Sequence, residues 1–201
     1  MDEVFYPVPI TIDPSTKTMT TTDTTLVDEI AELNKTYRQI LQLETRNQIP
    51  GPPTPVHQKR SVQVNKMREA GNTHYKRGAY SEAIKMYDLA IRMASERPPW
   101  EASGLVREEL STLYNNRSQA WMSQQLWAEA LVDAETSVEM KRVGNVKAWW
   151  RRGQCLKEMG RLREAKEVVS NGIELEKMSQ ERTALGELET LLKEISKALE
   201  N

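Results

Sequence analysis

RRGQCLKEMGRLREAKEVVSNGI, residues 151–173, is the stretch that decides the fold, because a related pattern occurs twice more in the 201-residue chain. The pattern appears as AGNTHYKRGAYSEAIKMYDLAI over 70–91 and as NRSQAWMSQQLWAEALVDAETSV over 116–138. Each stretch predicts a helix, a short break and a second helix that carries a small residue. Beyond Pro99 there is no proline, and Leu, Ala, Glu, Lys and Arg dominate, so helix is favoured throughout the second half.

Two columns of small residues align the three stretches. Small side chains at these places let paired helices approach closely, and a glycine after the first helix can end it. The corresponding residues are Gly71, Ser118 and Gly153 in the first helix and Ala83, Ala130 and Ala165 in the second, spaced by 47 and then 35 residues; Gly78 and Gly160 are the helix-ending glycines. The pattern resembles the tetratricopeptide repeat, whose period is about 34 residues.

This resemblance implies a mainly α fold, a right-handed superhelix of three helix pairs closed by a C-terminal capping helix. Starting the repeats at Val64, Ser111 and Val146 aligns the shared positions and puts Trp149 fourth, where the family prefers Trp. The predicted repeats cover about 64–97, 105–143 and 146–178, and the capping helix covers about 180–200. Within the first spacing, SERPPWEASGLVRE (95–108) is an insertion; Pro98 and Pro99 end a helix there, and 104–109 begins an extended one.

The chain ahead of the repeats has a different character. Thr-rich segments on either side of a Pro-Ser-Thr turn predict a hairpin, and apolar residues at three- and four-residue spacing predict an amphipathic helix over about 24–46, with Asp23 as its N-cap. Residues 49–58 contain four prolines, which no helix or central strand accommodates. We therefore expect an N-terminal domain over 1–48, a Pro-rich linker over 49–60 and a repeat domain over 61–201.

Composition and cysteine usage narrow the function classes. Twenty-eight Lys and Arg against 29 Asp and Glu give a net charge of −1, so no global field attracts nucleic acid or an anionic membrane. The lone Cys155 forms no internal disulfide, and with His57 and His74 it makes no convincing zinc set, so neither metal nor cofactor is expected. The N-terminus lacks the charged and apolar runs of a signal peptide, and no run is long enough to span a bilayer.

Enzymatic activity is not expected either. The sequence contains no Gly-rich phosphate loop, nucleophile elbow or paired-carboxylate motif. An enzyme with a helical-repeat accessory region would need its catalytic groups in residues 1–60, where none is visible. His74 and Cys155 fall on interior-facing positions of the first helices of their repeats, so packing explains them better than chemistry does.

Five polar residues in the first helices of the repeats form the candidate site. Arg68 and Asn72 are four residues apart and share one helix face, as do Lys147 and Arg151. With Asn116, these residues occupy the repeat positions of the dicarboxylate clamp, the subset of the tetratricopeptide family that binds the C-terminus of cytosolic heat-shock chaperones. The family usually has Lys where this chain has Arg68, which keeps the charge and changes the geometry.

The resemblance implies a peptide ligand that ends in Glu-Glu-Val-Asp. Its terminal Asp presents two carboxylates, for which Arg68, Lys147 and Arg151 would supply charge and the two asparagines directed donors. The competing interpretation of Lys147 and Arg151 alone is a solvated helix face. Trp149 is predicted to lie in the core, whereas Trp150 could contact the peptide or cap neighbouring helices. Elsewhere, Arg117 and Arg152 stand where the family often has Leu.

The flanking features carry a second, wider resemblance. The insertion RPPWEASG (97–104), the N-terminal strand-plus-helix domain and the length near 200 residues are together similar to the tetratricopeptide subunit of the fungal endoplasmic-reticulum Sec complex for post-translational translocation. That resemblance implies a non-catalytic receptor, held at the cytosolic face of the endoplasmic reticulum membrane by a membrane-anchored Sec-complex subunit. It also implies that the groove binds the tails of cytosolic chaperones, with the seventy-kilodalton class favoured. The alternative is a soluble co-chaperone or scaffold with the same groove and no membrane partner.

Overall fold

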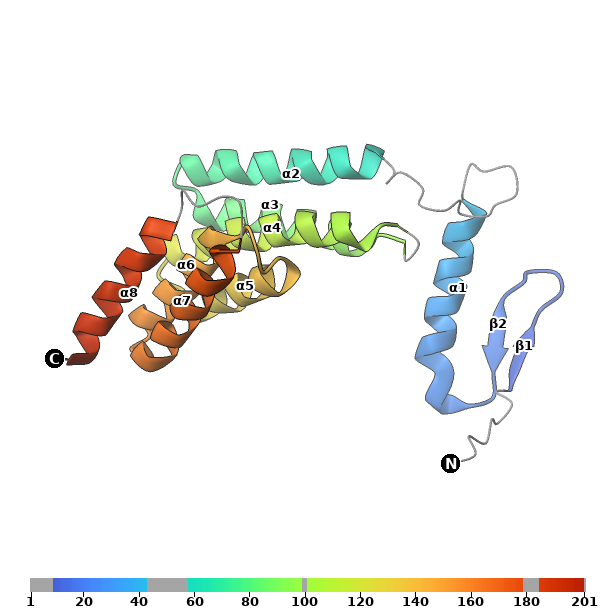
Figure 1. Cartoon of the computed structure of the whole chain (residues 1–201). Coiled ribbons are helices and arrows are strands. Elements are labelled where there is room, and N and C mark those ends of the chain that lie inside the picture. The colour runs from blue at the N-terminus through green and yellow to red at the C-terminus, as the bar shows by residue number, and fades with distance from the viewer. Residues whose placement is uncertain (1–8, 43–57, 99–100, 179–184, 201) are drawn as a thin grey trace, which may run out of the picture. The chain divides into compact units, whose positions relative to one another are not determined.

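The computed structural model describes residues 9–42, 58–98, 101–178 and 185–200 (Figure 1). The chain divides into two compact units, Met1–Thr54 with Pro98–Glu101 and Pro55–Arg97 with Ala102–Asn201. The described residues form eight α-helices and one two-stranded sheet, which confirms the mainly α class. Most of the predicted linker, residues 49–57, lies outside the described residues; helix α2 begins at Gln58, earlier than the expected boundary, because the last proline of that stretch is Pro55.

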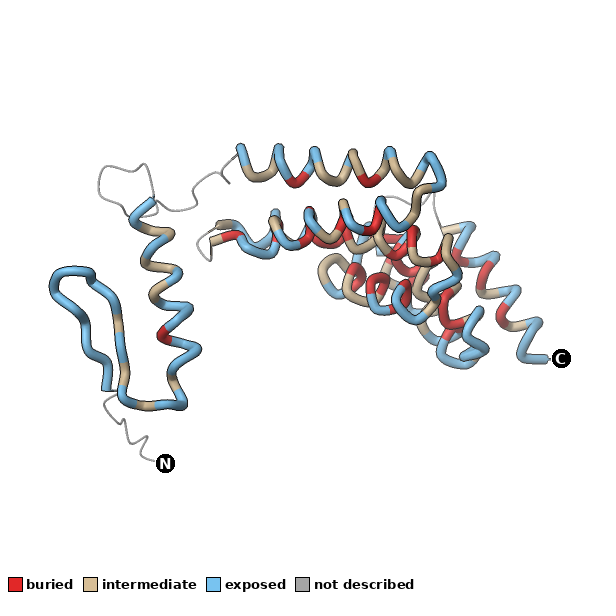
Figure 2. The backbone as a smooth tube through the Cα atoms, turned by 180° about the vertical axis from the view of Figure 1, so that it is seen from behind, coloured by how far each residue is buried: buried red, intermediate tan, exposed pale blue. Residues whose placement is uncertain are grey.

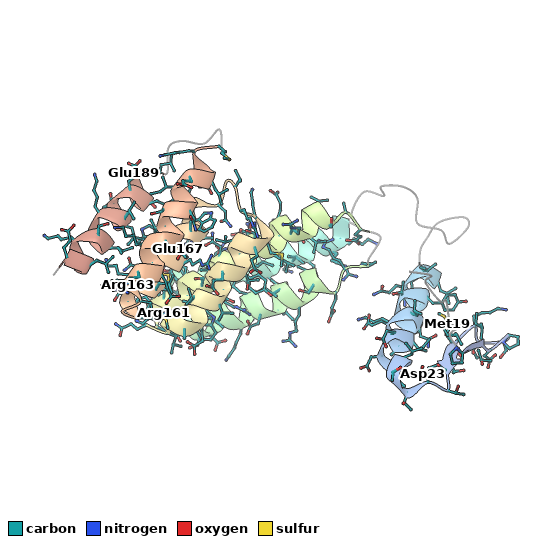
Figure 3. The ribbon with its side chains drawn as sticks, turned by 60° about the horizontal axis from the view of Figure 1, so that its bottom comes forward. Met19, Asp23, Arg161, Arg163, Glu167 and Glu189 are labelled. Atoms are coloured by element: carbon teal, nitrogen blue, oxygen red, sulfur yellow. The ribbon has the colours of Figure 1, made fainter. Side chains whose placement is uncertain are left out.

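The first unit is a hairpin followed by a helix. Strands β1 (Ile10–Ile12) and β2 (Met19–Thr21) pair antiparallel around a turn that the Asp13 carboxylate holds by accepting the backbone N–H of Ser15 at 2.7 Å. Asp23 caps the 3-10 turn η1 (Thr24–Leu26) and not the α-helix itself, whose N-cap position is Leu26; the predicted cap thus falls on the turn that leads into α1 (Figure 3). Helix α1 (Val27–Leu41) ends before the predicted boundary at 46, with Gln42 as its C-cap.

One side chain ties this helix to the hairpin. Asn34 on α1 donates to the carbonyl of Met19 and accepts from its N–H, both at 2.8 Å. Ile30 is the buried apolar residue of this unit's described part, whereas Val27, Leu33 and Leu41 are exposed. Such a small sheet and single helix bury little apolar surface, so this unit gains little stability from its own core.

The second unit is a run of helices in which each packs on the next along the chain. Helix α6 also contacts α8. Figure 2 shows the buried positions on the faces where neighbouring helices meet. Their bounds are α2 Gln58–Lys76, α3 Tyr80–Ser95, α4 Ser103–Ser123, α5 Trp127–Met140, α6 Val146–Glu158, α7 Leu162–Glu176 and α8 Leu185–Glu200. Helix α4 is the longest and starts inside the insertion, as the sequence predicted.

The columns of small residues lie where helices pair. A Cβ added at Gly71 would lie 2.5 Å from the Tyr87 ring, and one added at Gly153 would overlap Val169. Ser118, the middle member of that column, is fully buried and donates to the Ala130 carbonyl at 2.8 Å. At the two glycines a larger side chain is therefore excluded by steric overlap. At Ser118 the hydroxyl is accommodated because it forms a hydrogen bond to the neighbouring helix.

Ion pairs account for Arg117 and Arg152, the two arginines that stand where the tetratricopeptide family often has Leu. Arg117 donates to both oxygens of Asp133 at 2.6 and 2.7 Å and also pairs with Asp88. Arg152 pairs with Glu135 at 3.1 Å. Because the Asp133 side chain is only 3% exposed, the Arg117 pair joins α4 to α5 across the interior rather than over a solvated face. A charged pair thus stands where an apolar contact is usual.

The core predictions are confirmed for the third repeat. Trp149 is 5% exposed and Cys155 is fully buried, and both belong to the cluster that α5, α6, α7 and α8 share. The Trp149 indole N–H donates to the Arg142 carbonyl at 2.9 Å, so its one polar atom is satisfied. His74 is half-buried rather than interior.

Candidate carboxylate-binding groove

Three helices bring the predicted site residues to one region of the repeat unit. Arg68 and Asn72 lie on α2, Asn116 on α4, and Lys147 and Arg151 on α6. These are the first helices of the three pairs, and α4 contacts both of the others. Hydrogen bonds and electrostatic interactions with Tyr87 link four of these residues, and Lys147 lies on the same cavity as Arg151.

The two asparagines are in direct contact. Asn116 Nδ2 donates to Asn72 Oδ1 at 3.1 Å, and the Tyr87 hydroxyl donates to the same oxygen at 2.8 Å. Two donors on one oxygen fix which way the Asn72 amide faces, so its Nδ2 points away from Tyr87, toward Glu69 Oε2 at 3.3 Å. The sequence predicted that these amides share a site, and the structure places them side by side although they are 44 residues apart.

The phenol of Tyr87 links the two cationic ends. Burial raises the pKa of Tyr87 to about 12, and the charges of Arg68 and Arg151 act on it in the opposite direction. Both guanidinium groups are therefore close enough to influence one hydroxyl, which itself contacts Asn72. Asn72 and Asn116 are therefore linked by hydrogen bonds next to the Tyr87 hydroxyl, and Arg68 and Arg151 act on that hydroxyl electrostatically.

Arg151 is held by neutral groups. Its Nε donates to Gln119 Oε1 at 2.9 Å, and its Nη1 donates to Asn115 Oδ1. Burial lowers the pKa of Arg151 to about 10, so the guanidinium remains protonated at neutral pH. Since its hydrogen-bond acceptors are amide oxygens and not carboxylates, its positive charge is not cancelled by a bonded partner.

The sequence analysis did not single out Asn115 and Gln119. They are four residues apart on α4, and at the spacing of 47 they correspond to Arg68 and Asn72 of the first repeat. Applying the site positions of one repeat to the next would have found them. They position Arg151 rather than completing the predicted set.

Lys147 and Trp150 lie on a cavity beside Arg151. The cavity has a volume of about 630 Å³ and extends between α6 and α8. Lys147 is exposed there, while Trp150 is half-buried and also packs against the core. Leu191 adds an apolar wall, and Glu187 and Glu194 place carboxylates on the α8 side. The structure thus puts Trp150 on the wall of the groove and against neighbouring helices at once.

Arg68 lies at the opposite end, on a smaller cavity of about 390 Å³ between α2 and α4. Its Nη2 donates to Glu69 Oε1 at 2.8 Å. Among the residues that the structure describes, Arg68 Nε is the buried side-chain nitrogen or oxygen that lacks a hydrogen-bond partner. The α2 end therefore contains a cation with an unsatisfied buried Nε, whereas at the α6 end Nε and Nη1 of Arg151 both donate to amide oxygens.

Other site types are not found in the described part of the chain. Across 9–42, 58–98, 101–178 and 185–200, no three His, Cys, Asp or Glu side chains gather as metal ligands would. Over the same ranges, none of the helices has both the length and the apolar character that crossing a bilayer requires.

Comparisons with known protein families and solved structures show what the repeat unit is similar to. Residues 146–177, which contain α6 and α7, match the family model of the tetratricopeptide repeat. Residues 146–177 therefore resemble one tetratricopeptide repeat, and the sequential helix pairs and the aligned small residues are in keeping with that fold.

The sequence similarity of the chain to known proteins extends beyond residues 146–177. Over 124 residues the chain is 39% identical to the ER protein translocation subcomplex subunit sec67 of Schizosaccharomyces pombe, a match that covers 62% of this chain and 64% of that protein. A chain in the cryo-EM structure of the Sec complex from S. cerevisiae shares the fold with a TM-score of 0.70 at 22% identity, covering 95% of this chain and 97% of that one. The chain therefore has homology to a translocation subunit of S. pombe and a fold similar to that of a chain in the Sec complex of S. cerevisiae.

A third comparison concerns the repeats alone. The first tetratricopeptide domain of Spaghetti (RPAP3), solved with the HSP90 peptide SRMEEVD, superposes with a TM-score of 0.55 at 27% identity. The superposition covers 70% of this chain and 96% of that domain. The peptide in that structure ends in Glu-Glu-Val-Asp.

Proposed function

We propose that the groove formed by α2, α4 and α6 binds the free C-terminus of cytosolic heat-shock chaperones. The observation that carries this proposal is Arg151, a protonated guanidinium held by neutral amides and sharing its surroundings with Asn72 and Asn116. Burying a cation without a carboxylate partner is unfavourable, and an anionic ligand offsets that penalty. A repeat domain of similar fold was solved with a peptide of this kind, which supports the ligand class.

Each residue has a stated part in this binding. The terminal Asp of a Glu-Glu-Val-Asp tail presents an α-carboxylate and a side-chain carboxylate, and two carboxylates need two sets of donors. Lys147 and Arg151 would supply charge from α6, Arg68 would supply it from α2, and the asparagines would donate from between them. Affinity of about −7 to −8 kcal/mol, near micromolar, is expected for so short a contact, and it should weaken with salt.

The cavity between α6 and α8 would accept the residues ahead of the terminal Asp. Trp150 and Leu191 give it apolar surface for an aliphatic side chain such as the penultimate Val. This assignment makes Trp150 a groove contact and gives α8 a part in binding beyond capping the repeats.

We also infer the cellular location of the chain and the complex to which it belongs. Homology to a translocation subunit of S. pombe supports a non-catalytic, chaperone-docking subunit of the post-translational machinery at the endoplasmic reticulum. In this account a membrane-anchored Sec-complex subunit holds the chain at the cytosolic face, and the groove receives chaperones that deliver precursor proteins to the channel. The seventy-kilodalton chaperones are the favoured ligand class.

The test of the groove is a titration of the full chain with fluorescent tail peptides. The free-acid peptide should bind near micromolar, and Arg151→Ala should weaken binding by about 10- to 100-fold, because a charge-assisted contact contributes about 1.5–3 kcal/mol. Titrating tails of both chaperone classes ranks them. Equal affinity for the C-terminally amidated peptide would exclude the proposed groove.

Cell fractionation tests the placement. The chain should sediment with endoplasmic-reticulum membranes when its membrane-anchored partner is present and stay in the supernatant when that partner is deleted. Recovery in the supernatant in both cases would instead favour a soluble co-chaperone or scaffold with the same groove.

A further inference from the structure

Glu69 occupies the α2 half of the groove. Its Oε1 accepts from Arg68 Nη2 at 2.8 Å, and its Oε2 accepts from Asn72 Nδ2 at 3.3 Å. These are the two α2 groups assigned to the carboxylate of the peptide. One carboxylate of the chain therefore already contacts both of them.

The α6 half differs in kind. Arg151 is bonded to the amide oxygens of Asn115 and Gln119, which carry no net charge. A ligand carboxylate approaching Arg151 meets an unneutralised cation, whereas one approaching Arg68 meets a cation that is paired with Glu69. The two ends of the groove are thus unequal before any ligand binds.

The bond to Glu69 leaves Arg68 incomplete. Only Nη2 of the guanidinium is engaged by the carboxylate, and Nε is buried without a partner in the described part of the chain. An external carboxylate can take Nε and Nη2 together in the two-pronged geometry that guanidinium groups favour. That geometry requires Glu69 to leave Nη2 and Arg68 to turn so that its Nε becomes accessible.

We propose that Glu69 is a built-in competitor, a carboxylate of the chain that holds the α2 half of the groove closed and that the ligand displaces. This inference rests on the proposed peptide groove and deepens it. The Glu69 side chain is 58% exposed and that of Arg68 32%, so the pair is weak enough to open. Its effect is to make binding depend on a second ligand carboxylate able to replace Glu69, which selects tails with two carboxylates over those with one.

The experiment compares charge-matched variants of the full chain against the free-acid tail peptide. Glu69→Ala should tighten binding about 3- to 5-fold, the upper part of the roughly 1.4- to 5-fold range expected for loss of an exposed ion pair. Glu167→Ala removes the same charge from the exposed face of α7, where Glu167 lines neither of the two cavities, and it should change affinity less than 2-fold. In an Arg68→Ala background, Glu69→Ala should gain less than it does alone.

The outcomes separate this inference from the groove itself. If the wild-type chain fails to prefer the free-acid peptide, the proposed function fails. If it binds that peptide but Glu69→Ala leaves affinity unchanged, weakens it, or tightens it no more than Glu167→Ala does, the proposed role of Glu69 is refuted while the groove remains supported. Circular dichroism confirms that each variant keeps its helices, since both positions are exposed.

Discussion

Replacing Gln119 by Leu tests whether neutral amides hold Arg151. The Gln119 Oε1 accepts from Arg151 Nε at 2.9 Å, and Leu keeps the volume while removing the acceptor. Arg151 is half-buried and its bond to Gln119 is partly shielded from solvent, so water replaces the lost partner incompletely. Leaving a buried charged donor unsatisfied costs about 1–3 kcal/mol. A loss of this size lowers the melting temperature of the repeat unit by roughly 2–12 °C.

The measurement is urea and thermal unfolding followed by circular dichroism, with Gln154→Leu as the matched control. Gln154 lines the same cavity but bonds only to the exposed Glu158, at 2.8 Å, so its loss should cost under about 0.5 kcal/mol. A double-mutant cycle with Arg151→Leu should give a coupling energy of about 1–2 kcal/mol between positions 119 and 151. If Gln119→Leu is as stable as Gln154→Leu, Arg151 is not held in the way described.

Three further outcomes follow from the packing of the repeat unit. Asp133→Ala should lower the free energy of unfolding by about 3 kcal/mol, because it removes the buried carboxylate that pairs with Arg117. Replacing both Arg117 and Asp133 by Leu should cost far less, and equal losses in denaturant titrations would contradict this prediction. Gly153→Ala should lower the free energy of unfolding by about 1–3 kcal/mol, because the added carbon would overlap Val169 on α7. Gly186→Ala should be neutral or slightly stabilising in the same unfolding assay, because nothing lies within 4 Å of the added carbon. Cys155, whose pKa burial raises to about 12, should be a thiolate in only about one molecule in 10⁴ at pH 8, so a disulfide reagent should label it quickly only after unfolding; rapid labelling of the folded chain would show that the site is open.

Much of this fold is readable from the sequence because the repeat imposes size limits that recur. Gly71 and Gly153 align at fixed spacings, and in the structure each faces a side chain that leaves no room for a Cβ. The repeat register also places Asn72 and Asn116 together, as the hydrogen bond between them confirms. Because these steric limits come from the close approach of paired helices, they favour a small residue at the same position of each repeat, which the sequence shows directly.

Partner choices among polar side chains were not predictable in the same way. Arg117 occupies a position that favours Leu, and its compensation by Asp133 depends on how α4 crosses α5. The attachment of Glu69 to the α2 half of the groove depends on side-chain rotation within a single helix turn, which residue spacing does not specify. Helix α1 likewise ends at Leu41 although the apolar pattern suggested a longer helix, since periodicity predicts helix faces better than helix ends.

The most direct measurement is the affinity of the full chain for one tail peptide in two forms, with a free C-terminal carboxylate and with an amide. The two peptides differ only in whether the terminal carboxylate is charged, which is the group that Arg151 and the asparagines are proposed to bind. We predict near-micromolar binding of the free acid, binding weaker by at least about 10-fold for the amide, and loss of that difference in Arg151→Ala. Equal affinities for the two peptides in the wild-type chain would contradict the account.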